Sequence, residues 1–158
     1  MCIRDRFYDR VSQAIHRSER RTETDVAVLL LDIDGYRAIT ENIGRPAAEE
    51  VLKAVAPRLE TALRPEDTLA RLGRDEFVVL LTETTPEDAD SVAERLLARL
   101  SRDLHLAGRV HRLSASIGVS LHESGLSCDD LVRRADRAVA RAKEQGRGRV
   151  EFLSLIHI

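Results

Sequence analysis

Two pairs of acidic residues stand where carboxylates could work together. Asp32 and Asp34 end an apolar run that begins near residue 26, and Asp75 and Glu76 lie in a predicted tight turn. Open sheets usually bind ligands at the carboxyl ends of their strands. Carboxylates there suit Mg²⁺, which prefers hard oxygen ligands and bridges phosphates. If the two strands are neighbours, Asp32 and Asp75 converge and could share a metal; otherwise each pair is an ordinary acidic strand end or turn.

Basic residues near the end of the chain form a candidate phosphate site. Lys143 lies in the last turn of a predicted helix, and Arg147 follows that helix. Lysine as a point charge and arginine as a planar fork both suit phosphate oxygens. The alternative is a solvated basic helix end, which the helix dipole also favours. Gly73, beside Arg71 in the predicted turn, could let backbone N–H groups approach a phosphate.

The spacing of apolar residues predicts the elements that position these groups. The predicted elements are a helix around Phe7–Ile15, a strand over 25–32, a helix over 46–63 containing Pro57, a hairpin of 68–72 and 76–81, a helix capped by Thr85, a strand over 110–119, a helix from Ser127 to Gly146 and a strand over 149–152. A hairpin between helical crossovers implies a mixed central β-sheet with flanking helices. The expected fold class is therefore α/β, as an α+β sandwich.

Composition and charge exclude several classes of protein. The 158 residues include 25 Lys and Arg against 27 Asp and Glu, and the formal net charge of −2 argues against a general nucleic-acid binder. The longest uninterrupted apolar run, residues 26–31, is far too short to span a bilayer. Two cysteines offer no disulfide framework. A chain of this length is expected to form one domain.

The two ends of the chain have an unusual relationship. The sequence MCIRDR can be back-translated to ATG TGT ATA AGA GAC AG, and LSLIHI to CTG TCT CTT ATA CAC AT. These strings are reverse complements and look like the transposon-end adapter used to build sequencing libraries. We therefore expect residues 1–6 and 153–158 to be translated adapter, and 7–152 to be a piece of a longer protein.

Several motifs resemble those of the GGDEF domain of diguanylate cyclases, in the family's order. LDIDGYRAI at 31–39 resembles LDIDxFKxIN, and RLGRDEF at 71–77 stands where RYGGDEF belongs. SIGV at 116–119 matches directly, and RAD at 134–136 with AKEQGR at 142–147 matches RAD…AKxxGR. The resemblance covers essentially all of 7–152 and begins just after the family's usual DxLTGLxNR stretch.

The resemblance implies a palm-like fold and the condensation of two GTP to cyclic di-GMP. Each subunit of an antiparallel homodimer would present one GTP, and Mg²⁺ or Mn²⁺ would neutralise charge as a 3′-hydroxyl attacks an α-phosphate. By position, Asp32, the Ile33 carbonyl and Asp75 would hold the metals, and Asp75 and Glu76 would be the catalytic acids. The expected GTP-binding residues are Thr40, Glu49, Gly73, Arg74, Lys143 and Arg147.

A further match lies five residues before Gly73. The sequence RPED, from Arg64 to Asp67, has the RxxD pattern that the family uses to bind its product at an inhibitory site, and Arg95 falls on an auxiliary arginine of that site. Arginine forks can pair with phosphates or a guanine edge, and an aspartate can accept from guanine N–H groups. The resemblance therefore implies an inhibitory cyclic di-GMP site at Arg64, Asp67 and Arg95.

This copy departs from the family pattern at the GTP pocket. Arg74 replaces the second glycine, and its Cβ would restrict phosphate approach and a positive φ. Thr40 replaces an asparagine, whose paired donor and acceptor a hydroxyl lacks, and Glu49 replaces an aspartate. We therefore expect a weak or silent cyclase. The alternatives are a non-catalytic GTP- or cyclic di-GMP-binding regulatory module, and a dimerising scaffold that binds neither nucleotide.

The resemblance also implies a setting for the domain. It is expected to be cytoplasmic, to have an upstream sensor and to adjoin a downstream phosphodiesterase domain in some full-length proteins. Whether the parent protein is membrane-anchored stays open, and nucleic acid is not an expected partner.

Overall fold

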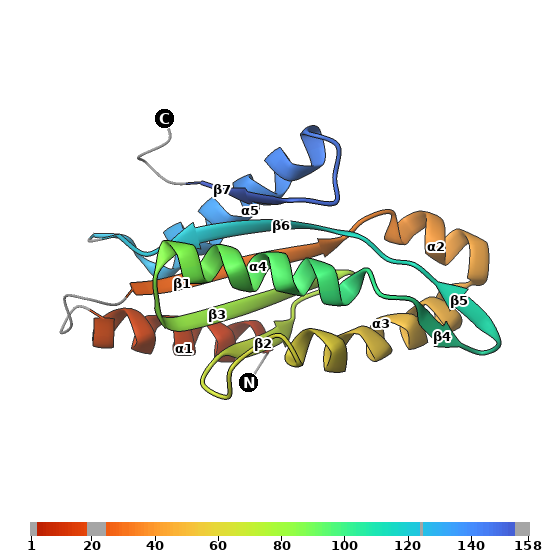
Figure 1. The fold of residues 1–158 in the computed structure, drawn as a ribbon. Helices are drawn as coiled ribbons and strands as arrows, with labels where there is room; N and C mark the ends of the chain where they lie inside the picture. The colour runs from red at the N-terminus through yellow and green to blue at the C-terminus, as the bar shows by residue number, and fades with distance from the viewer. Residues whose placement is uncertain (1–2, 19–24, 124, 154–158) are drawn as a thin grey trace.

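The computed structural model describes residues 3–18, 25–123 and 125–153, which form a sheet flanked by helices (Figure 1). The elements in chain order are α1 (Ile3–Ser18), β1 (Asp25–Ile33), α2 (Tyr36–Ile43), α3 (Arg45–Glu60), β2 (Thr68–Arg71), β3 (Glu76–Thr84), α4 (Pro86–Leu100), β4 (Leu104–Leu106), β5 (Arg109–His111), β6 (Ala115–Leu121), α5 (Cys128–Glu144) and β7 (Val150–Phe152).

The central sheet has five strands in the order β2-β3-β1-β6-β7. The pairs β2–β3, β3–β1 and β1–β6 are antiparallel, and β6–β7 is parallel. The apolar runs of β1 and β3 place both strands in the interior of the sheet, where both faces are covered. The mixed sheet with flanking helices confirms the expected fold class.

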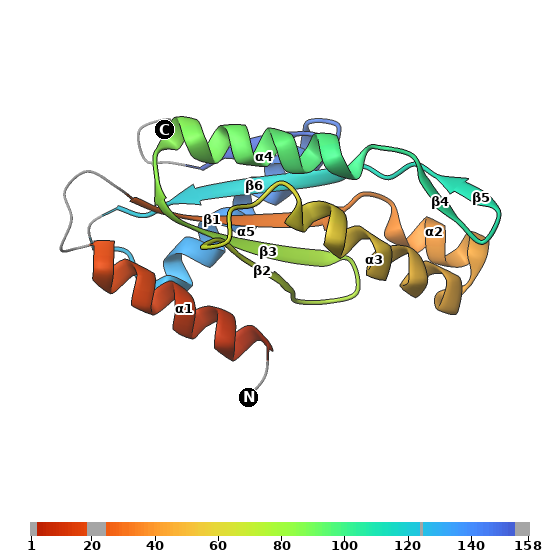
Figure 2. The ribbon, with the colours of Figure 1, turned by 60° about the horizontal axis from the view of Figure 1, so that its bottom comes forward.

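Alternate side chains of β1 pack into two separate hydrophobic cores, one on each face of the sheet. Leu29 and Leu31 belong to a buried cluster with residues of α3 and α4. Val28 and Leu30 point to the other face, where the cluster includes Phe7 of α1 and residues of α5. Figures 1 and 2 show α4 and α5 on opposite faces of the sheet. A buried strand with both faces covered explains why this run does not alternate with polar residues.

Two helix starts follow the predicted capping chemistry. The Thr85 hydroxyl accepts a hydrogen bond from the Asp88 N–H at 3.1 Å, and Pro86 occupies the first turn. Ser127 and Asp130 form a reciprocal capping box at the start of α5. Each cap satisfies helix N–H groups that have no partner within the helix, so these residues fix where α4 and α5 begin.

The helix predicted over 46–63 ends earlier than expected. α3 ends at Glu60, three residues beyond Pro57. The Ala62 and Leu63 N–H groups donate to carbonyls three residues back, at 3.0 Å each, so the chain tightens into turns. The prediction of the helix itself is confirmed, and its last turn is corrected.

The single strand predicted over 110–119 is wrong. β4 and β5 form a separate two-stranded hairpin, and only β6 enters the main sheet. Ala107 and Gly108 have positive φ angles of 52° and 76°, as a two-residue hairpin turn requires. Val110 is 53% exposed, whereas Leu113 is buried. The alternating apolar residues therefore belong to two strands, of which β5 is exposed at Val110 and β6 is buried in the main sheet.

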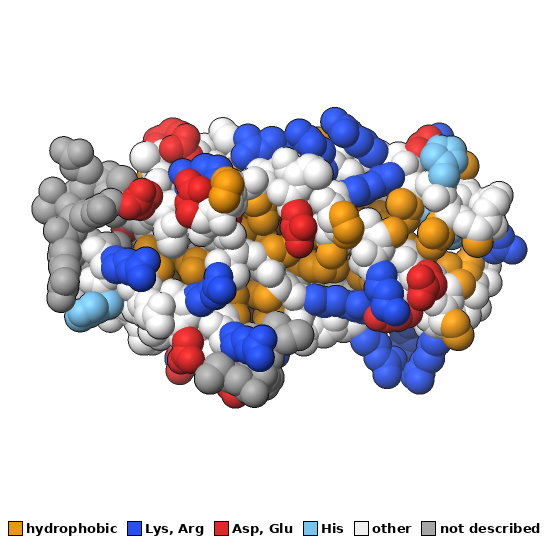
Figure 3. Space-filling view, turned by 90° about the horizontal axis from the view of Figure 1, so that it is seen from below, with side chains coloured by type: hydrophobic (Ala, Val, Ile, Leu, Met, Phe, Trp, Pro, Cys, Tyr) orange, Lys and Arg blue, Asp and Glu red, His pale blue; other side chains and the backbone are white. Residues whose placement is uncertain are grey.

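The surface fits the charge balance of the sequence. Figure 3 views the molecule from below Figure 1 and shows acidic and basic side chains interspersed, with apolar side chains visible between them. Within the part of the chain that the structure describes, no helix has the length and apolar character needed to cross a membrane.

Gly118 lets α5 pack directly on the sheet. A Cβ at this position would lie 2.1 Å from the Ala135 carbonyl oxygen and 2.6 Å from the Val139 nitrogen, both in the α5 backbone. We expect Gly118→Ala to lower the free energy of unfolding by about 3 kcal/mol, because backbone atoms cannot move aside as a flexible side chain can. Denaturant unfolding measures this change.

A neighbouring residue on the same face provides the matched control. The buried Ser120 hydroxyl has no hydrogen-bond partner among the described residues. We expect Ser120→Ala to raise stability by about 1 kcal/mol, because it removes an unsatisfied polar group. A Gly118→Ala protein as stable as the original chain would contradict the close packing.

Candidate active site at the β1–β3 strand ends

The two predicted acidic pairs meet at one end of the sheet. Asp32 pairs with Glu76 in the β1–β3 ladder. The Ile33 N–H donates to the Asp75 carbonyl oxygen at 2.9 Å and extends the pairing by one step. The Asp32 and Asp75 carboxyl groups come within hydrogen-bonding reach of each other. The prediction that these two acids converge is therefore confirmed.

The closeness of the acids changes how they titrate. Burial raises the pKa of Asp75, and the neighbouring Asp32 charge and hydrogen bond raise it further. Burial also raises the pKa of Glu76, with added contributions from Asp32 and Asp136. Both groups hold protons more tightly than ordinary carboxyls, as expected where like charges share a site.

Lys143 balances part of this negative charge. It lies in the last turn of α5, and its ammonium forms an ion pair with Asp32. Its charge opposes the rise in the pKa of Asp75, although burial and Asp32 outweigh it. The sequence predicted Lys143 as a phosphate ligand; the structure places it beside the acids.

Asp34 connects the end of β1 to β6 and to the loop between α5 and β7. Its Oδ1 accepts from the buried Ser116 hydroxyl at 2.7 Å, and its Oδ2 accepts from the Gly148 N–H at 3.0 Å. Arg147 precedes this anchored glycine and has a φ of 64°, a left-handed value that costs energy for a side chain with a Cβ. Asp34 therefore fixes the segment that carries Arg147, whose side chain is exposed.

The donor set at the strand ends fits a hard divalent cation. Two carboxylates, Asp32 and Asp75, lie together beside the Ile33 backbone, and Mg²⁺ is commonly held by one or two carboxylates with the rest of its shell from water and phosphates. Among residues 3–18, 25–123 and 125–153, no group of three or more His, Cys, Asp or Glu side chains is suited to a metal. The remaining ligands of a cation here would therefore be backbone, water or phosphate oxygens.

The turn at residues 73–75 has no left-handed backbone position at Gly73 or Arg74. Residues 73 and 74 are absent from the positions with positive φ, and Arg74 is exposed. A Cβ at Gly73 would only reach Glu76 atoms at 3.9 Å, an ordinary contact. Arg74 therefore occupies this turn without the positive φ that its Cβ would disfavour. The Gly73 N–H lies 3.5 Å from the Glu76 carbonyl oxygen, a long hydrogen bond that leaves this donor weakly engaged.

The two residues predicted to contact a base have partners within the protein. The Thr40 hydroxyl donates to the Tyr36 carbonyl of its own helix at 3.0 Å. Both Glu49 carboxylate oxygens accept from Arg71, at 2.7 and 3.0 Å. This hydrogen bonding lowers the pKa of Glu49, so the group is held as a carboxylate.

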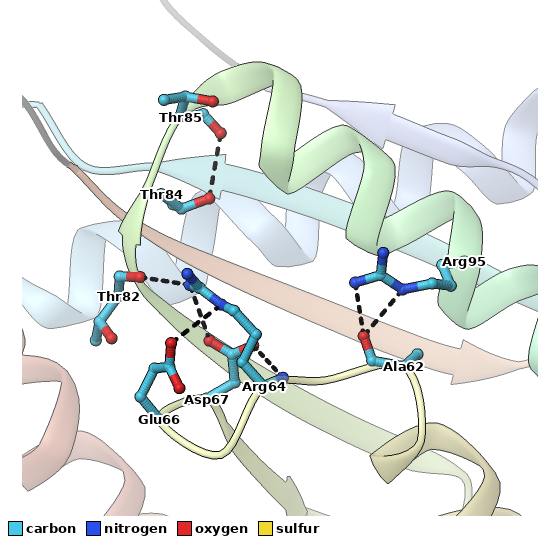
Figure 4. Close-up of polar contacts among 8 residues, drawn as sticks. All are labelled: Ala62, Arg64, Glu66, Asp67, Thr82, Thr84, Thr85 and Arg95. Atoms are coloured by element: carbon cyan, nitrogen blue, oxygen red, sulfur yellow. Dashed lines mark hydrogen bonds and ion pairs between the residues drawn. The ribbon is translucent and has the colours of Figure 1, made fainter.

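The predicted inhibitory residues lie on the turn before β2 and on α4 (Figure 4). Arg64 donates to the Thr82 carbonyl oxygen at 2.7 Å and forms ion pairs with Glu66 and Asp67. Arg95 donates twice to the Ala62 carbonyl oxygen, at 3.1 and 2.8 Å. The Asp67 side chain is 0% exposed and accepts from the Arg64 backbone N–H, so it closes its own turn.

The Thr82 carbonyl that Arg64 contacts belongs to a β-bulge. Asp25 pairs with Thr84 and Ala27 pairs with Leu81, so two steps along β1 match three along β3. Glu83 in this bulge has a φ of 51°. A bulge removes backbone groups from the regular ladder, which leaves the Thr82 carbonyl available to Arg64.

Sequence reasoning missed the structural roles of two polar residues. Arg71 was noted only as a residue flanking the turn, and Asp34 only as a possible metal ligand. Both act through hydrogen bonds to residues distant in sequence, Asp34 to Gly148 and Arg71 to Glu49. The sequence feature that could have indicated these roles is that both residues lie within motifs that also contain the predicted site residues.

Comparison with known proteins gives a consistent result. The family model described as "Diguanylate cyclase, GGDEF domain" matches residues 3–149. The chain is 39% identical over 148 residues to the bifunctional diguanylate cyclase/cyclic di-GMP phosphodiesterase MucR of Pseudomonas aeruginosa, with 93% of this chain and 21% of MucR covered. It is 34% identical to the cyclic di-GMP phosphodiesterase NbdA of the same organism, over 82% of this chain and 17% of NbdA. The chain thus spans about a fifth of the length of these relatives.

A solved structure also matches across nearly the whole chain. The crystal structure of the GGDEF domain of YfiN (also named TpbB) from Pseudomonas aeruginosa superposes with a TM-score of 0.91 at 32% identity. The match covers 96% of each chain. The arrangement of strands and helices is therefore the same in the two proteins.

Removing the Asp75 charge is expected to stabilise the cation-free protein. Folding raises the pKa of Asp75 above 3.8, so the folded protein binds this proton more tightly than the unfolded chain does. The free energy of unfolding therefore falls as the pH rises from below 3.8 past the raised pKa. Asp75→Asn avoids this loss. With EDTA present we expect its Tm at pH 7 to exceed that of the original chain by on the order of a few degrees, and the difference to shrink toward pH 4.

The matched control is Glu41→Gln, an exposed acid whose side chain is 70% accessible. We expect this variant to leave the Tm nearly unchanged at both pH values. A lower Tm for Asp75→Asn at pH 7 would mean that Lys143 more than compensates the Asp75 charge.

Proposed function

The chain belongs to the GGDEF family of diguanylate cyclase domains, and on this basis we propose that it binds GTP with Mg²⁺ or Mn²⁺ at the ends of β1 and β3 and condenses two GTP to cyclic di-GMP at a reduced rate. The convergence of Asp32 and Asp75 beside Lys143 is the observation that carries the proposal. Carboxylates next to a cationic side chain can hold a divalent ion and the phosphates that it bridges.

We propose Asp32, Asp75 and the Ile33 carbonyl as the cation ligands. A divalent ion bound there supplies charge neutralisation for the transferring phosphoryl group. Lys143 is paired with Asp32 in this structure. When the carboxylates are engaged by a cation, the Lys143 ammonium becomes available to phosphate oxygens, and Arg147 offers a planar fork on the neighbouring segment.

The reaction requires two bound nucleotides, so we propose that two copies of this domain face each other. The 3′-hydroxyl of one GTP attacks the α-phosphate of the other, and pyrophosphate leaves. Glu76 is a candidate proton acceptor for that hydroxyl, because burial brings the pKa of its carboxyl closer to neutrality. Proximity and alignment of the reacting groups supply most of the remaining rate.

We propose that base recognition, rather than the turn, limits turnover. The Thr40 hydroxyl already donates its hydrogen to Tyr36 and can only accept from a base. Glu49 is held by Arg71 and must share its oxygens with that guanidinium. Arg74 is exposed and without backbone strain, so its effect on phosphate binding is expected to be smaller than that of the two base contacts.

A regulatory module is the second candidate function, and the placement of two arginines favours it. Arg64 and Arg95 lie on one surface (Figure 4): Arg95 is bonded to the Ala62 carbonyl, and Arg64 to the Thr82 carbonyl and to the carboxylates of Glu66 and Asp67. A phosphate could replace those carbonyls as acceptor. Asp67 is buried in its turn, so its use by a ligand would require the turn to open. We propose cyclic di-GMP as the ligand of Arg64, Arg95 and Asp67.

The setting of the domain is also proposed from the family. Because the chain spans about a fifth of MucR, we infer an upstream sensor and, in some architectures, an adjoining phosphodiesterase domain. GTP is a cytoplasmic substrate for such signalling, so the domain is proposed to face the cytoplasm.

The activity prediction is a low but measurable rate. Purified chain incubated with GTP and Mn²⁺ is expected to form cyclic di-GMP slowly, as followed by liquid chromatography and mass spectrometry. Thr40→Asn is expected to raise the rate about tenfold, equivalent to about 1.4 kcal/mol of transition-state stabilisation, and Arg74→Gly alone is expected to raise it less. Asp75→Asn is expected to abolish product. Turnover by the original chain equal to that of Thr40→Asn, or a larger gain from Arg74→Gly than from Thr40→Asn, would contradict the proposed limit on base recognition.

The binding prediction separates the regulatory module from the enzyme. Calorimetry is expected to detect cyclic di-GMP binding to the original chain and at least a tenfold loss of affinity in Arg64→Ala, about 1.4 kcal/mol. The control is Arg37→Ala, an arginine on α2 that is 94% exposed and paired with Glu41. Binding that survives in Arg64→Ala would exclude this site, and binding without any GTP turnover would favour the regulatory function.

A further inference from the structure

The guanidinium of Arg71 is shared between a helix and the turn that carries Asp75. Arg71 is the last residue of β2, and its Nη1 and Nη2 donate to the two oxygens of Glu49 on α3. Its Nε donates to the Gly73 carbonyl oxygen at 2.9 Å, and Nη2 donates to the Arg74 carbonyl oxygen at 2.6 Å. One side chain therefore holds two successive carbonyls of the turn against α3.

Peptide geometry determines what these contacts do to the turn. Peptide units are planar, and no cis bond occurs among the described residues, so each N–H points opposite to the carbonyl of the same unit. Drawing the carbonyls of Gly73 and Arg74 toward Arg71 thus turns the N–H groups of Arg74 and Asp75 away from it. The next carbonyl of the chain, that of Asp75, accepts from the Ile33 N–H of β1 at 2.9 Å. The placement of Asp75 beside β1 is therefore linked to the Arg71 contacts.

We propose that Arg71 is a positioning residue that sets the 73–75 turn so that the Asp75 carboxylate faces Asp32 and the Arg74 N–H stays directed toward the site. Arg71 does this without touching substrate or cation. The inference rests on the proposed function only in that the Asp32–Asp75 pair is taken to be the cation site. The bond to Glu49 extends the role, because it anchors the turn to α3.

The chemistry of the contacts explains why arginine is required. Four contacts to acceptors on two sides use the planar fork of a guanidinium, which an ammonium on a lysine cannot reproduce. The Arg71 side chain is 26% exposed and Glu49 is 41% exposed, so the pair is partly shielded from water. Because the contacts use backbone carbonyls, the side chain at position 74 does not enter them. The turn can therefore keep its shape with arginine in place of glycine at that position.

The test measures cation binding without nucleotide, so it does not depend on turnover. We expect Arg71→Ala to weaken Mn²⁺ binding, measured by calorimetry, by at least about tenfold, as is typical when a group that orients a metal ligand is removed. Arg71→Lys is expected to lose nearly as much. Millimolar guanidinium chloride is expected to restore much of the affinity of Arg71→Ala, because it supplies the missing planar donors.

The matched control is Arg112→Ala. Arg112 also donates from Nε, to Asp103 at 3.0 Å, but it is 80% exposed and lies outside the site. It is expected to leave Mn²⁺ affinity unchanged and to gain nothing from guanidinium. An Arg71→Ala protein that loses Tm but binds Mn²⁺ as tightly as the original chain would overturn the proposal and leave Arg71 a purely structural residue.

Failure of the proposed cation site has a different signature. If the original chain does not bind Mn²⁺, the proposed function is at fault, and the amide resonances of Arg74 and Asp75 then decide the role of Arg71. Shifts of both resonances in Arg71→Lys, with none in Arg112→Ala, would support the positioning role. Unchanged resonances in Arg71→Lys would overturn it.

Discussion

The antiparallel pairing of β1 with β3 is the constraint on which the rest of the site depends. Both strands are apolar and buried, and their register is fixed because a slip by one residue would turn each core side chain to the opposite face. The same register places two acids from distant parts of the chain at one strand end. Hydrophobic burial therefore supplies the force that holds like charges together, and the raised pKa of Asp75 records the electrostatic penalty.

Polar contacts around this pair act mainly on backbone groups. Asp34 accepts from the Gly148 N–H, and Arg71 donates to the carbonyls of Gly73 and Arg74. Such contacts set the path of a loop whatever side chains that loop displays. A substitution in a signature motif can thus leave the local backbone in place, and its effect is then confined to what the new side chain itself excludes or attracts.

The parts of the molecule that follow local rules could be predicted from the sequence. The caps at Thr85 and Ser127 and the buried strands depend on short-range chemistry and apolar patterning. The β4–β5 hairpin was missed because Val110 continues an apolar alternation although it lies on the surface. The convergence of Asp32 and Asp75 followed from assuming that their strands were neighbours. The partner of Glu49 could not be predicted, since it depends on which donor the fold brings within 3 Å, whereas the contact of Asp67 lies within its own turn.

The two ends of β3 differ in their contacts, because the bulge near its C-terminal end frees a backbone carbonyl for a side chain. β3 begins at Glu76, beside the acids, and its far end presents the Thr82 carbonyl to Arg64. At about 3.4 Å per residue, the stretch from Glu76 to Thr82 extends for about 20 Å between these regions. Any anion that takes the Arg64 guanidinium must compete with the main chain of β3 for the same N–H groups. Binding of an anion to Arg64 therefore breaks the hydrogen bond that holds this side chain to the Thr82 carbonyl. The strand that loses this contact, β3, carries the acids at its other end.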